Sequence, residues 1–172
     1  MIETDKTYYL HENVTGREDL GCRFRCVLGE KGAEFYFDVK DEDLISPYRE
    51  NNEDIWQGDA VEVFLSPDGD TSRYKELEVS PFGVRFYGNI VNEDGKTPVL
   101  EKLTPPFEAS AERTEEGYRV AIFLPYTALQ GFDRARAKMN AFRLDKKTNG
   151  EQRLYALNPT HCDSFHRSEY LI

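Results

Sequence analysis

Apolar and polar residues alternate with a period of two over most of this chain, which is typical of β-strands that bury one face. The segment "AEFYFDVKD" (33–41) places apolar, mostly aromatic residues at every second position, and "GCRFRCVL" (21–28) precedes it across the turn "GEKG". A glycine-containing turn between two alternating segments favours a β-hairpin. The pattern therefore predicts a hairpin from about residue 21 to residue 41.

The same alternation recurs further along the chain and is interrupted each time by turn residues. "DAVEVFLS" (59–66) and "YKELEVSP" (74–81) flank the turn "PDGD", and "GVRFYGNIV" (83–91) follows them. Two more hairpins are predicted, one at 107–125 with its turn at "TEEG" and one at 138–159 with its turn at "TNG". Strands therefore dominate the predicted regular structure.

A helical period is absent from every segment of ordinary helix length. The segment "YTALQGFDRA" (126–135) predicts one short helical turn or an irregular connection. Short strands with frequent turns predict an all-β fold, a two-sheet antiparallel β-sandwich. Because the sequence has no low-complexity linker and no internal repeat, we expect a single domain over residues 1–172.

Residues 42–58, "EDLISPYRENNEDIWQG", follow no period and are rich in polar residues. Loops of this length inside a compact domain are uncommon and tend to be functional. This excursion ends with Trp56, the only tryptophan of the chain, which has acids on both sides. A tryptophan in such polar surroundings is poorly explained as a core residue.

Charge narrows the classes of partner. The chain has 172 residues, of which 32 are acidic and 22 are basic, and its formal net charge is -10. An acidic surface repels phosphate backbones and anionic lipids, so we expect neither nucleic acid nor membrane as a partner. A neutral or cationic ligand is favoured, although the acids also serve solubility. The sequence does not indicate an oligomeric state.

Cellular location and cysteine chemistry are only weakly constrained. No apolar stretch approaches the ~18 residues of a membrane span, and the N-terminus does not resemble a signal peptide. We therefore expect either a cytoplasmic protein or an excised module of a secreted one. Cys22 and Cys26 would lie roughly 13 Å apart on one face of a strand, too far apart for a disulfide. Buried or half-buried free thiols are predicted.

Glutamates recur on one face of two predicted strands. Glu62 in "AVEVF" points away from the valines beside it, and Tyr74, Glu76 and Glu78 in "YKELEVS" share one face. If these strands pair, a row of acids and one aromatic residue lies on a single sheet face. Arg143 alternates with its apolar neighbours in "AFRLD", and we expect it to neutralise part of this row.

The acidic row has three interpretations. It is a solvated outer face, where surface ion pairs contribute less than ~1 kcal/mol, or a polar floor for a ligand rich in hydroxyl groups. Alternatively, Glu62 with Glu76 or Glu78 forms the carboxylate pair of a glycosidase, held about 5–10 Å apart. Spacing alone does not decide among them.

Metal ligands are sparse in the sequence. Asp68 and Asp70 in the turn "SPDGD" offer oxygen ligands for a structural calcium ion. His161 and His166 lie in the tail "HCDSFH" without the second ligand pair that zinc sites usually have. Hydrogen-bonded structural histidines are therefore the simpler interpretation of that tail. Signatures for phosphate binding or for a serine or cysteine nucleophile are missing.

Trp56 and Phe165 are the two aromatic residues in the most polar predicted loops. Aromatic rings stack on the C–H faces of sugars, while nearby polar groups bind the hydroxyls. The alternative is that each ring plugs one end of the sandwich. The residues alone favour neither interpretation.

The order of these motifs resembles the carbohydrate-binding modules of family 9 and their stand-alone relatives. The family pattern of Trp, a short gap, "D-x-V-E-x-F", an acidic turn and "Y…E-x-x-x-P-x-G" is similar to "IWQGDAVEVFLSPDGD…YKELEVSPFG". Downstream, "GYRVAIFLPYTAL", "MNAFRLD" and "YALNPT…FHRSEYLI" resemble later family motifs in the same order. The likeness extends from about residue 34 to the C-terminus.

This resemblance implies a carbohydrate-binding-module-like β-sandwich that binds saccharides without cleaving them and holds structural calcium. It implies that Trp56 and Phe165 clamp a sugar and that Glu62 contacts its hydroxyls. Glu78 stands where sugar-binding members carry an arginine, and Phe142 stands where they carry a glutamine. These departures concern the residues that hydrogen-bond the sugar hydroxyls in those members.

We therefore predict non-catalytic binding of a mono- or oligosaccharide, or of a plant-type polysaccharide, between aromatic residues over a polar floor. Predicted binding residues are Trp56, Glu62, Tyr74, Glu76, Glu78, Asn140, Arg143, Phe165 and His166. Two alternatives remain: a small glycoside hydrolase or lyase that uses Glu62 with Glu76 or Glu78, and a sandwich interaction domain that has lost sugar binding.

Overall fold

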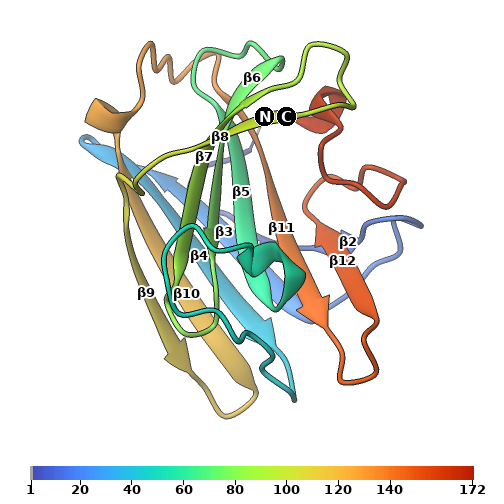
Figure 1. Ribbon diagram of the computed structural model, residues 1–172. Helices are drawn as coiled ribbons and strands as arrows, with labels where there is room; N and C mark the ends of the chain where they lie inside the picture. Colours follow the sequence, from blue (N-terminus) through green and yellow to red (C-terminus); the bar gives the residue numbers. More distant parts are fainter. Residues whose placement is uncertain (1) are drawn as a thin grey trace.

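Two antiparallel β-sheets pack face to face, which confirms the predicted all-β sandwich (Figure 1). The computed structural model describes residues 2–172. A five-stranded sheet has the order β1-β3-β4-β10-β9, and a seven-stranded sheet has the order β2-β12-β11-β5-β6-β7-β8. The strands are β1 (Thr7–Tyr9), β2 (His11–Glu12), β3 (Cys22–Leu28), β4 (Gly32–Lys40), β5 (Ala60–Ser66), β6 (Arg73–Val79), β7 (Arg85–Val91), β8 (Val99–Lys102), β9 (Glu108–Arg113), β10 (Gly117–Pro125), β11 (Lys138–Lys146) and β12 (Gln152–Ala156). Short 3-10 helices are η1 (Ile55–Gln57), η2 (Tyr126–Ala128) and η3 (Ser168–Tyr170).

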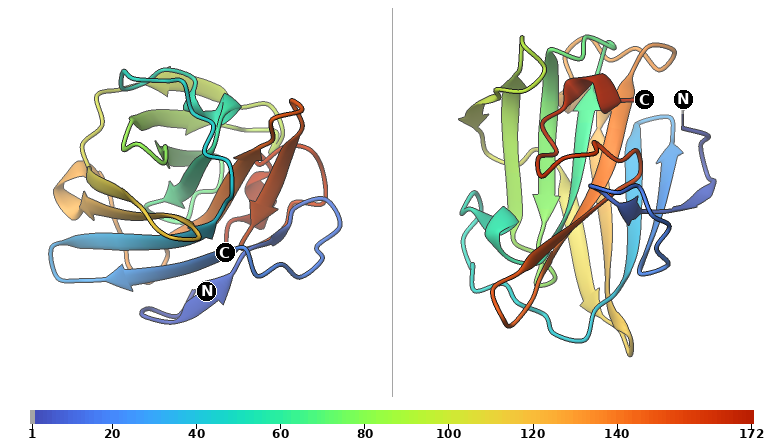
Figure 2. Two further views of the ribbon diagram at one scale, coloured as in Figure 1. Left: turned by 90° about the horizontal axis from the view of Figure 1, so that it is seen from below. Right: turned by 90° about the vertical axis from the view of Figure 1, so that its right-hand side faces the viewer.

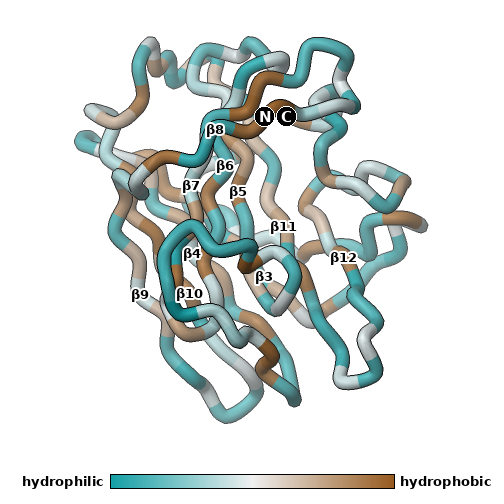
Figure 3. Tube along the Cα trace, in the orientation of Figure 1, coloured by the Kyte–Doolittle hydropathy of each residue, from teal (hydrophilic) through white to brown (hydrophobic). Residues whose placement is uncertain are grey.

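The main core lies between the two sheets, which form separate layers in Figure 2. Strand β5 directs Val61 and Val63 into this core, opposite Phe24 and Phe37, whose ring centroids lie 5.0 Å apart. In Figure 3 apolar and polar segments alternate along the strands, whereas the connecting loops are mainly hydrophilic. The period of two in the sequence therefore places one face of each central strand in the core.

The seven-stranded sheet is also covered on its outer face, the face turned away from the five-stranded sheet. Phe64 and Phe142 form a second apolar cluster there with Phe165 and Leu171 of the C-terminal segment 157–172. The right panel of Figure 2 shows this segment crossing in front of the sheet. All seven residues of β5 are consequently buried, since both faces of the strand are covered.

The excursion at 42–58 is a loop, as predicted, and it folds back onto the seven-stranded sheet. The side-chain oxygen of Asn52 accepts a hydrogen bond from the backbone nitrogen of Tyr87 at 2.9 Å. Ile55, in η1, is fully buried beside Phe86 of β7. These contacts attach the end of the excursion to the sheet.

Trp56 is held through its backbone while its ring remains accessible. Its carbonyl oxygen accepts a hydrogen bond from the side-chain nitrogen of Gln152 at 2.7 Å. A Cβ atom at Gly58 would lie 2.6 Å from the carbonyl oxygen of Ile45, so the loop closes tightly behind the ring. Trp56 is 43% exposed. It is therefore not a core residue, although its buried neighbour Ile55 is.

Three strands are absent from the sequence-based prediction, namely β1, β2 and β8. All four residues of β8 are exposed, and β1 is an edge strand of only three residues. Such strands bury no continuous face and therefore show no alternation. Cys22 and Cys26 are buried and unpaired, as predicted. Within residues 2–172 the structure contains no helix with the length and apolar character needed to span a membrane.

Single replacements of Ile55 and Trp56 by alanine should show that Ile55 stabilises the loop, whereas Trp56 mainly presents its ring to solvent. Ile55→Ala should lower the free energy of unfolding by about 2–4 kcal/mol, because it leaves a cavity under η1. Trp56→Ala should change it by less than about 1 kcal/mol, because the exposed ring packs little. Urea denaturation of the two variants measures this difference. A loss of stability in Trp56→Ala as large as that in Ile55→Ala would show that Trp56 belongs to the core.

Candidate functional site

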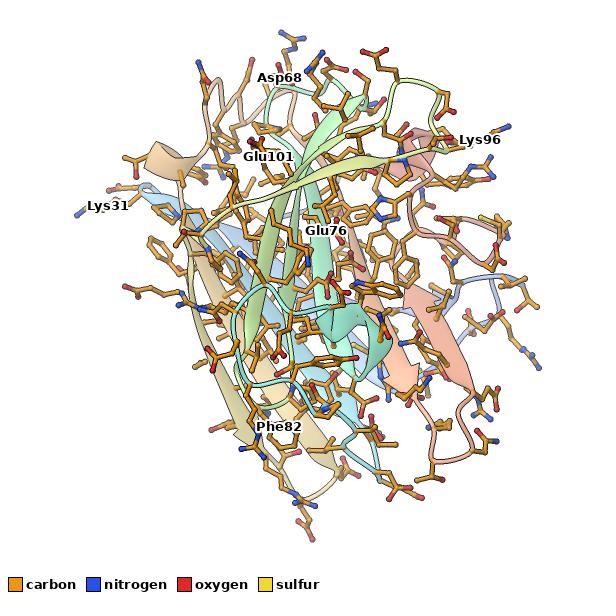
Figure 4. The ribbon with its side chains drawn as sticks, viewed as in Figure 1. Lys31, Asp68, Glu76, Phe82, Lys96 and Glu101 are labelled. Atoms are coloured by element: carbon orange, nitrogen blue, oxygen red, sulfur yellow. The ribbon has the colours of Figure 1, made fainter. Side chains whose placement is uncertain are left out.

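A pocket of about 400 Å³ opens on the outer face of the seven-stranded sheet, between the excursion and the C-terminal segment. We refer to it as the outer pocket. Its lining includes Trp56, Glu62, Glu76, Phe86, Leu100, Phe165 and His166. Figure 4 shows Glu76 near the middle of this face, far from the Asp68 turn at one end of the molecule.

The floor of the outer pocket contains the predicted row of acids. Glu62 pairs directly with Glu78 across β5 and β6, and Glu76 lies on the same face one alternate position away. Carboxylate oxygens of the three residues lie within 4.8 Å of one another. Glu62 is 2% exposed, Glu76 5% and Glu78 0%. The interpretation of this row as a solvated outer face is therefore wrong.

Glu78 lies beneath the pocket, and neither of its carboxylate oxygens has a hydrogen-bond partner. Burial, together with the charge of Glu76, raises the pKa of Glu78 well above the ordinary value. Burial and the charges of Glu76 and Glu78 likewise raise the pKa of Glu62. Burial disfavours the ionised form and like charges add to this, so Glu62 and Glu78 hold protons more tightly than free glutamates do.

The two predicted aromatic residues both line the outer pocket, but their rings differ in how much surface they expose to a ligand. Trp56 presents a largely open ring at the rim. Phe165 is only 8% exposed, and one face of its ring stacks on Phe142 with the centroids 4.1 Å apart. A ligand can therefore meet only the remaining face or edge of Phe165.

Tyr74, which is buried, and His166, which is partly buried, form a polar pair at the side of the outer pocket. The Tyr74 hydroxyl lies 2.8 Å from Nδ1 of His166, and the His166 ring stacks on Phe64. Burial lowers the pKa of His166, which favours the neutral ring. Only His166 of this pair lines the pocket, so Tyr74 orients the imidazole from behind.

Asn140 and Arg143 are not brought into the outer pocket. The Asn140 amide donates to the carbonyl of Asn158 and accepts from its backbone nitrogen, at 2.8 and 3.0 Å. Arg143 points to the inner face, where its guanidinium lies 3.3 Å from Asp41 and 3.4 Å from Asp145. The prediction that Arg143 neutralises the glutamate row is wrong, because Phe142 occupies the outer face and adjacent strand residues point oppositely.

The Arg143 network belongs to a second buried acidic group, formed by Asp41, Asp59 and Asp145. Asp59 accepts hydrogen bonds from the backbone nitrogens of Ile45 and Lys146, and burial raises its pKa to about 6. It thereby ties the excursion to β11. Because Arg143 already supplies a positive charge to two of these acids, the group is compensated from within the chain.

The predicted calcium ligands lie in a surface turn. Asp68 accepts a hydrogen bond from the backbone nitrogen of Asp70, and Asp70 accepts from the backbone and hydroxyl of Ser72. Calcium takes six to eight oxygen ligands. Neither aspartate belongs to a three-acid group within residues 2–172, so a calcium ion at this turn would need further oxygen ligands from backbone carbonyls or water.

Other lining residues have no clear signal in the sequence. Leu100 lies on β8, which shows no alternation. Its side chain covers Gly88, where a Cβ atom would approach a Leu100 methyl to 2.3 Å. Phe86 follows the strand period, but only the fold shows that its face borders the pocket. The absence of a side chain at Gly88 therefore lets a neighbouring strand form one wall.

A β-sandwich with an outer pocket that has aromatic walls over polar side chains is typical of an all-β ligand-binding domain. Residues 2–168 match the family described as Carbohydrate family 9 binding domain-like. The chain belongs to this family, which confirms the resemblance found in the sequence.

Solved structures agree on the fold. A protein from Bacteroides uniformis that has been assigned as carbohydrate-binding shares 15% identity, with a TM-score of 0.77 over 96% of this chain and 84% of that one. A family 9 carbohydrate-binding module from Caldicellulosiruptor kristjanssonii was solved with cellotriose and with glucose. The cellotriose complex gives 12% identity and a TM-score of 0.58 over 95% and 75% of the two chains. The glucose complex gives 11% identity and a TM-score of 0.60 over 95% and 81%.

At these identities the likeness establishes the fold alone. No curated protein sequence matches the chain.

Glu78→Gln should stabilise the protein at neutral pH. The amide keeps the shape of the side chain and needs neither a buried charge nor the uptake of a proton on folding, so the free energy of unfolding should rise by about 1–2 kcal/mol. Thermal or urea denaturation at pH 7 measures the gain. A loss of stability would show that the charged carboxylate of Glu78 is favourable in the fold.

The same acids should make stability fall as pH rises. Because the native pKa values of Glu62 and Glu78 lie above the ordinary 4.5, the native state binds protons that the unfolded chain has released. Asp59 adds to this effect between its ordinary value of 3.8 and about 6. The contribution of these acids to the free energy of unfolding should therefore decrease from about pH 4 upward, so the free energy of unfolding should fall less, or rise more, with pH in Glu78→Gln than in the native protein. Equal slopes in the two proteins would contradict the assignment.

Proposed function

We propose that the protein binds a saccharide in the outer pocket without chemically changing it. The observation that carries the proposal is the half-exposed ring of Trp56 at the rim of a pocket whose floor consists of carboxylates. An aromatic face suits the apolar C–H face of a pyranose, and carboxylates accept hydrogen bonds from hydroxyl groups. Membership in a family of carbohydrate-binding domains supports this use of the pocket.

In the proposed complex, Trp56 and the free side of Phe165 hold the sugar ring between them. Glu62 and Glu76 accept hydrogen bonds from its hydroxyls, and His166 offers a ring nitrogen positioned by Tyr74. Since Phe165 is fixed on Phe142, the adjustable side of this clamp is Trp56.

The ligand is proposed to be a mono- or oligosaccharide, or the end of a plant-type polysaccharide chain. Support comes from the family 9 module of known structure that binds cellotriose and glucose. A pocket of about 400 Å³ lies within the range usual for small-molecule sites. Because two aromatic rings and few polar groups do the binding, we expect dissociation constants from about micromolar to millimolar, about -8 to -4 kcal/mol.

A hydrolase remains the alternative, since Glu62, Glu76 and Glu78 lie close enough together for carboxylate chemistry. Glycosidases, however, place their two carboxyl groups on either side of the scissile bond. Here the acids are neighbours in one sheet and lie along a single floor, which supports binding over cleavage. A turnover assay on oligosaccharides decides this: release of product by the protein, lost in Glu62→Gln, would establish the hydrolase.

Trp56→Ala should abolish saccharide binding while the protein remains folded. Removing the ring takes away the stacking surface, which is worth about 1–3 kcal/mol for a buried aromatic face. A millimolar ligand should then fall below detection, and a micromolar one should bind roughly 5- to 150-fold more weakly. A glycan array identifies the ligand, and calorimetry with that ligand then compares the variant with the native protein. A useful control is Phe82→Ala, because Phe82 is also exposed but lies at the opposite end of the molecule from Asp68 and does not line the pocket (Figure 4).

Two outcomes would contradict the proposal. If no glycan on the array binds, the domain is the interaction module that has lost its sugar ligand. If Trp56→Ala binds as well as the native protein, the saccharide site lies elsewhere.

A further inference from the structure

The glutamates beneath the outer pocket lack the countercharge that the chain gives to two of its other buried acids, Asp41 and Asp145. Asp41 and Asp145 lie 3.3 and 3.4 Å from the guanidinium of Arg143. By contrast, the ion pairs of residues 2–172 all involve carboxylates other than the three glutamates. Three carboxylates packed together without a cation are unfavourable in a folded protein.

Glu78 shows this lack most clearly. It is fully buried, neither of its oxygens has a hydrogen-bond partner, and these oxygens face those of Glu62 and Glu76. Glu62 and Glu76 line the outer pocket, whereas Glu78 does not. A cation from solution therefore reaches the group through the outer pocket.

Lys102 does not serve as this cation. Its charge acts on Glu78, but its ammonium group is bound 2.8 Å from Oδ1 of Asp54 and 3.0 Å from the carbonyl oxygen of Asn52. It also lies over the ring of Phe86, 5.3 Å from the centroid. Lys102 thus holds the excursion on the sheet and leaves the glutamates open to an external cation.

The walls of the outer pocket favour an organic cation over a metal ion. Most of the lining outside the glutamates is apolar, with Trp56, Phe86, Leu100 and Phe165 the main contributors, and Gln152, Asp163 and Ser164 are its other oxygen-bearing side chains. A divalent ion seeks oxygen on all sides, which this largely apolar lining does not offer. An ammonium group attached to a carbon ring satisfies both parts of the site. Its N–H groups donate to carboxylates, the ring contacts the apolar walls, and the charge gains from the aromatic faces. The net charge of -10 adds long-range attraction.

We propose that the outer pocket selects saccharides that carry a protonated primary amine, namely amino sugars, over neutral saccharides of the same ring. This inference rests on the proposed function, because it names the class of saccharide that the same pocket binds. The ammonium group donates hydrogen bonds to the carboxyl oxygens of Glu62 and Glu76, and the buried carboxyl group of Glu78 lies behind them. An N-acetylated amino sugar has no such charge and is not preferred.

The test compares glucosamine, glucose and N-acetylglucosamine at about pH 6.5, where a primary amine is protonated. Because Trp56 is the only tryptophan and lines the pocket, its fluorescence reports occupancy directly. We expect the dissociation constant of glucosamine to be at least tenfold lower than those of the two uncharged sugars, about 1.4 kcal/mol. EDTA is present in all of these sugar titrations, so that trace metal ions do not compete.

Substitutions of the glutamates test whether the preference for glucosamine over glucose depends on the acidic floor of the pocket. In Glu76→Gln, and in Glu62→Gln as a second variant, the ratio of the glucose to the glucosamine dissociation constant should fall toward one. Glu101→Gln removes the same charge from exposed strand β8, outside the pocket lining, and should keep the native ratio (Figure 4). Thermal unfolding of each variant verifies that it is folded.

The outcomes separate this inference from the proposed function. Binding of glucose and glucosamine with equal affinity would overturn the amine preference and leave saccharide binding intact. Failure of every sugar, including cellotriose and a glycan array, would overturn both. If calcium or manganese chloride without EDTA displaces glucosamine, and the displacement is lost in Glu76→Gln, then the glutamates form a metal site and the inference is wrong. A preference unchanged in both glutamine variants would also overturn it.

Discussion

The structure depends on a central sheet that is covered on both of its faces. Strand β5 is buried at all seven positions, because the five-stranded sheet covers one side while the excursion and the C-terminal segment cover the other. The first cover is made by regular strands and leaves a continuous apolar core. The second is made by two irregular segments from distant parts of the chain, which do not meet completely. The outer pocket lies between these two segments, so it results from the way the sheet is covered.

Covering the outer face also buries its glutamates. The two buried acidic groups of the chain differ in the partners that they receive. The aspartate group receives Arg143 and backbone donors, and it ties the excursion to the sheet. The glutamate group receives no such partner, and it lies under the pocket. One group therefore stabilises the loop that carries Trp56, whereas the other leaves carboxyl groups without a cation where a ligand would enter.

Much of the fold and part of the site could be predicted from the sequence, because alternation reports which face of a strand is buried. It placed Glu62, Glu76 and Glu78 on one face, and the strand pairing confirms this. It could not show that a tail nearly a hundred residues further along covers that face, since such contacts leave no local period. The prediction that Arg143 neutralises the glutamates relied on charge alone. Because Arg143 is adjacent to Phe142, which faces outward, its side chain points to the opposite face of the sheet. Strand β8 escaped prediction because it is exposed, so Leu100 was missed as well.

The fold alone does not explain why three glutamates stay together in a buried row. At Glu78 the resemblance to sugar-binding relatives implies an arginine, whose charge would compensate Glu62 and Glu76; a glutamate there reverses the sign of the floor. Packing does not require this, since a glutamine of the same shape would fill the space without burying a charge. Local features that oppose stability are expected where a site serves binding. The row reaches the surface only through Glu62 and Glu76 in the pocket lining, so a bound ligand would contact it there, which is the explanation that the proposed amine preference offers.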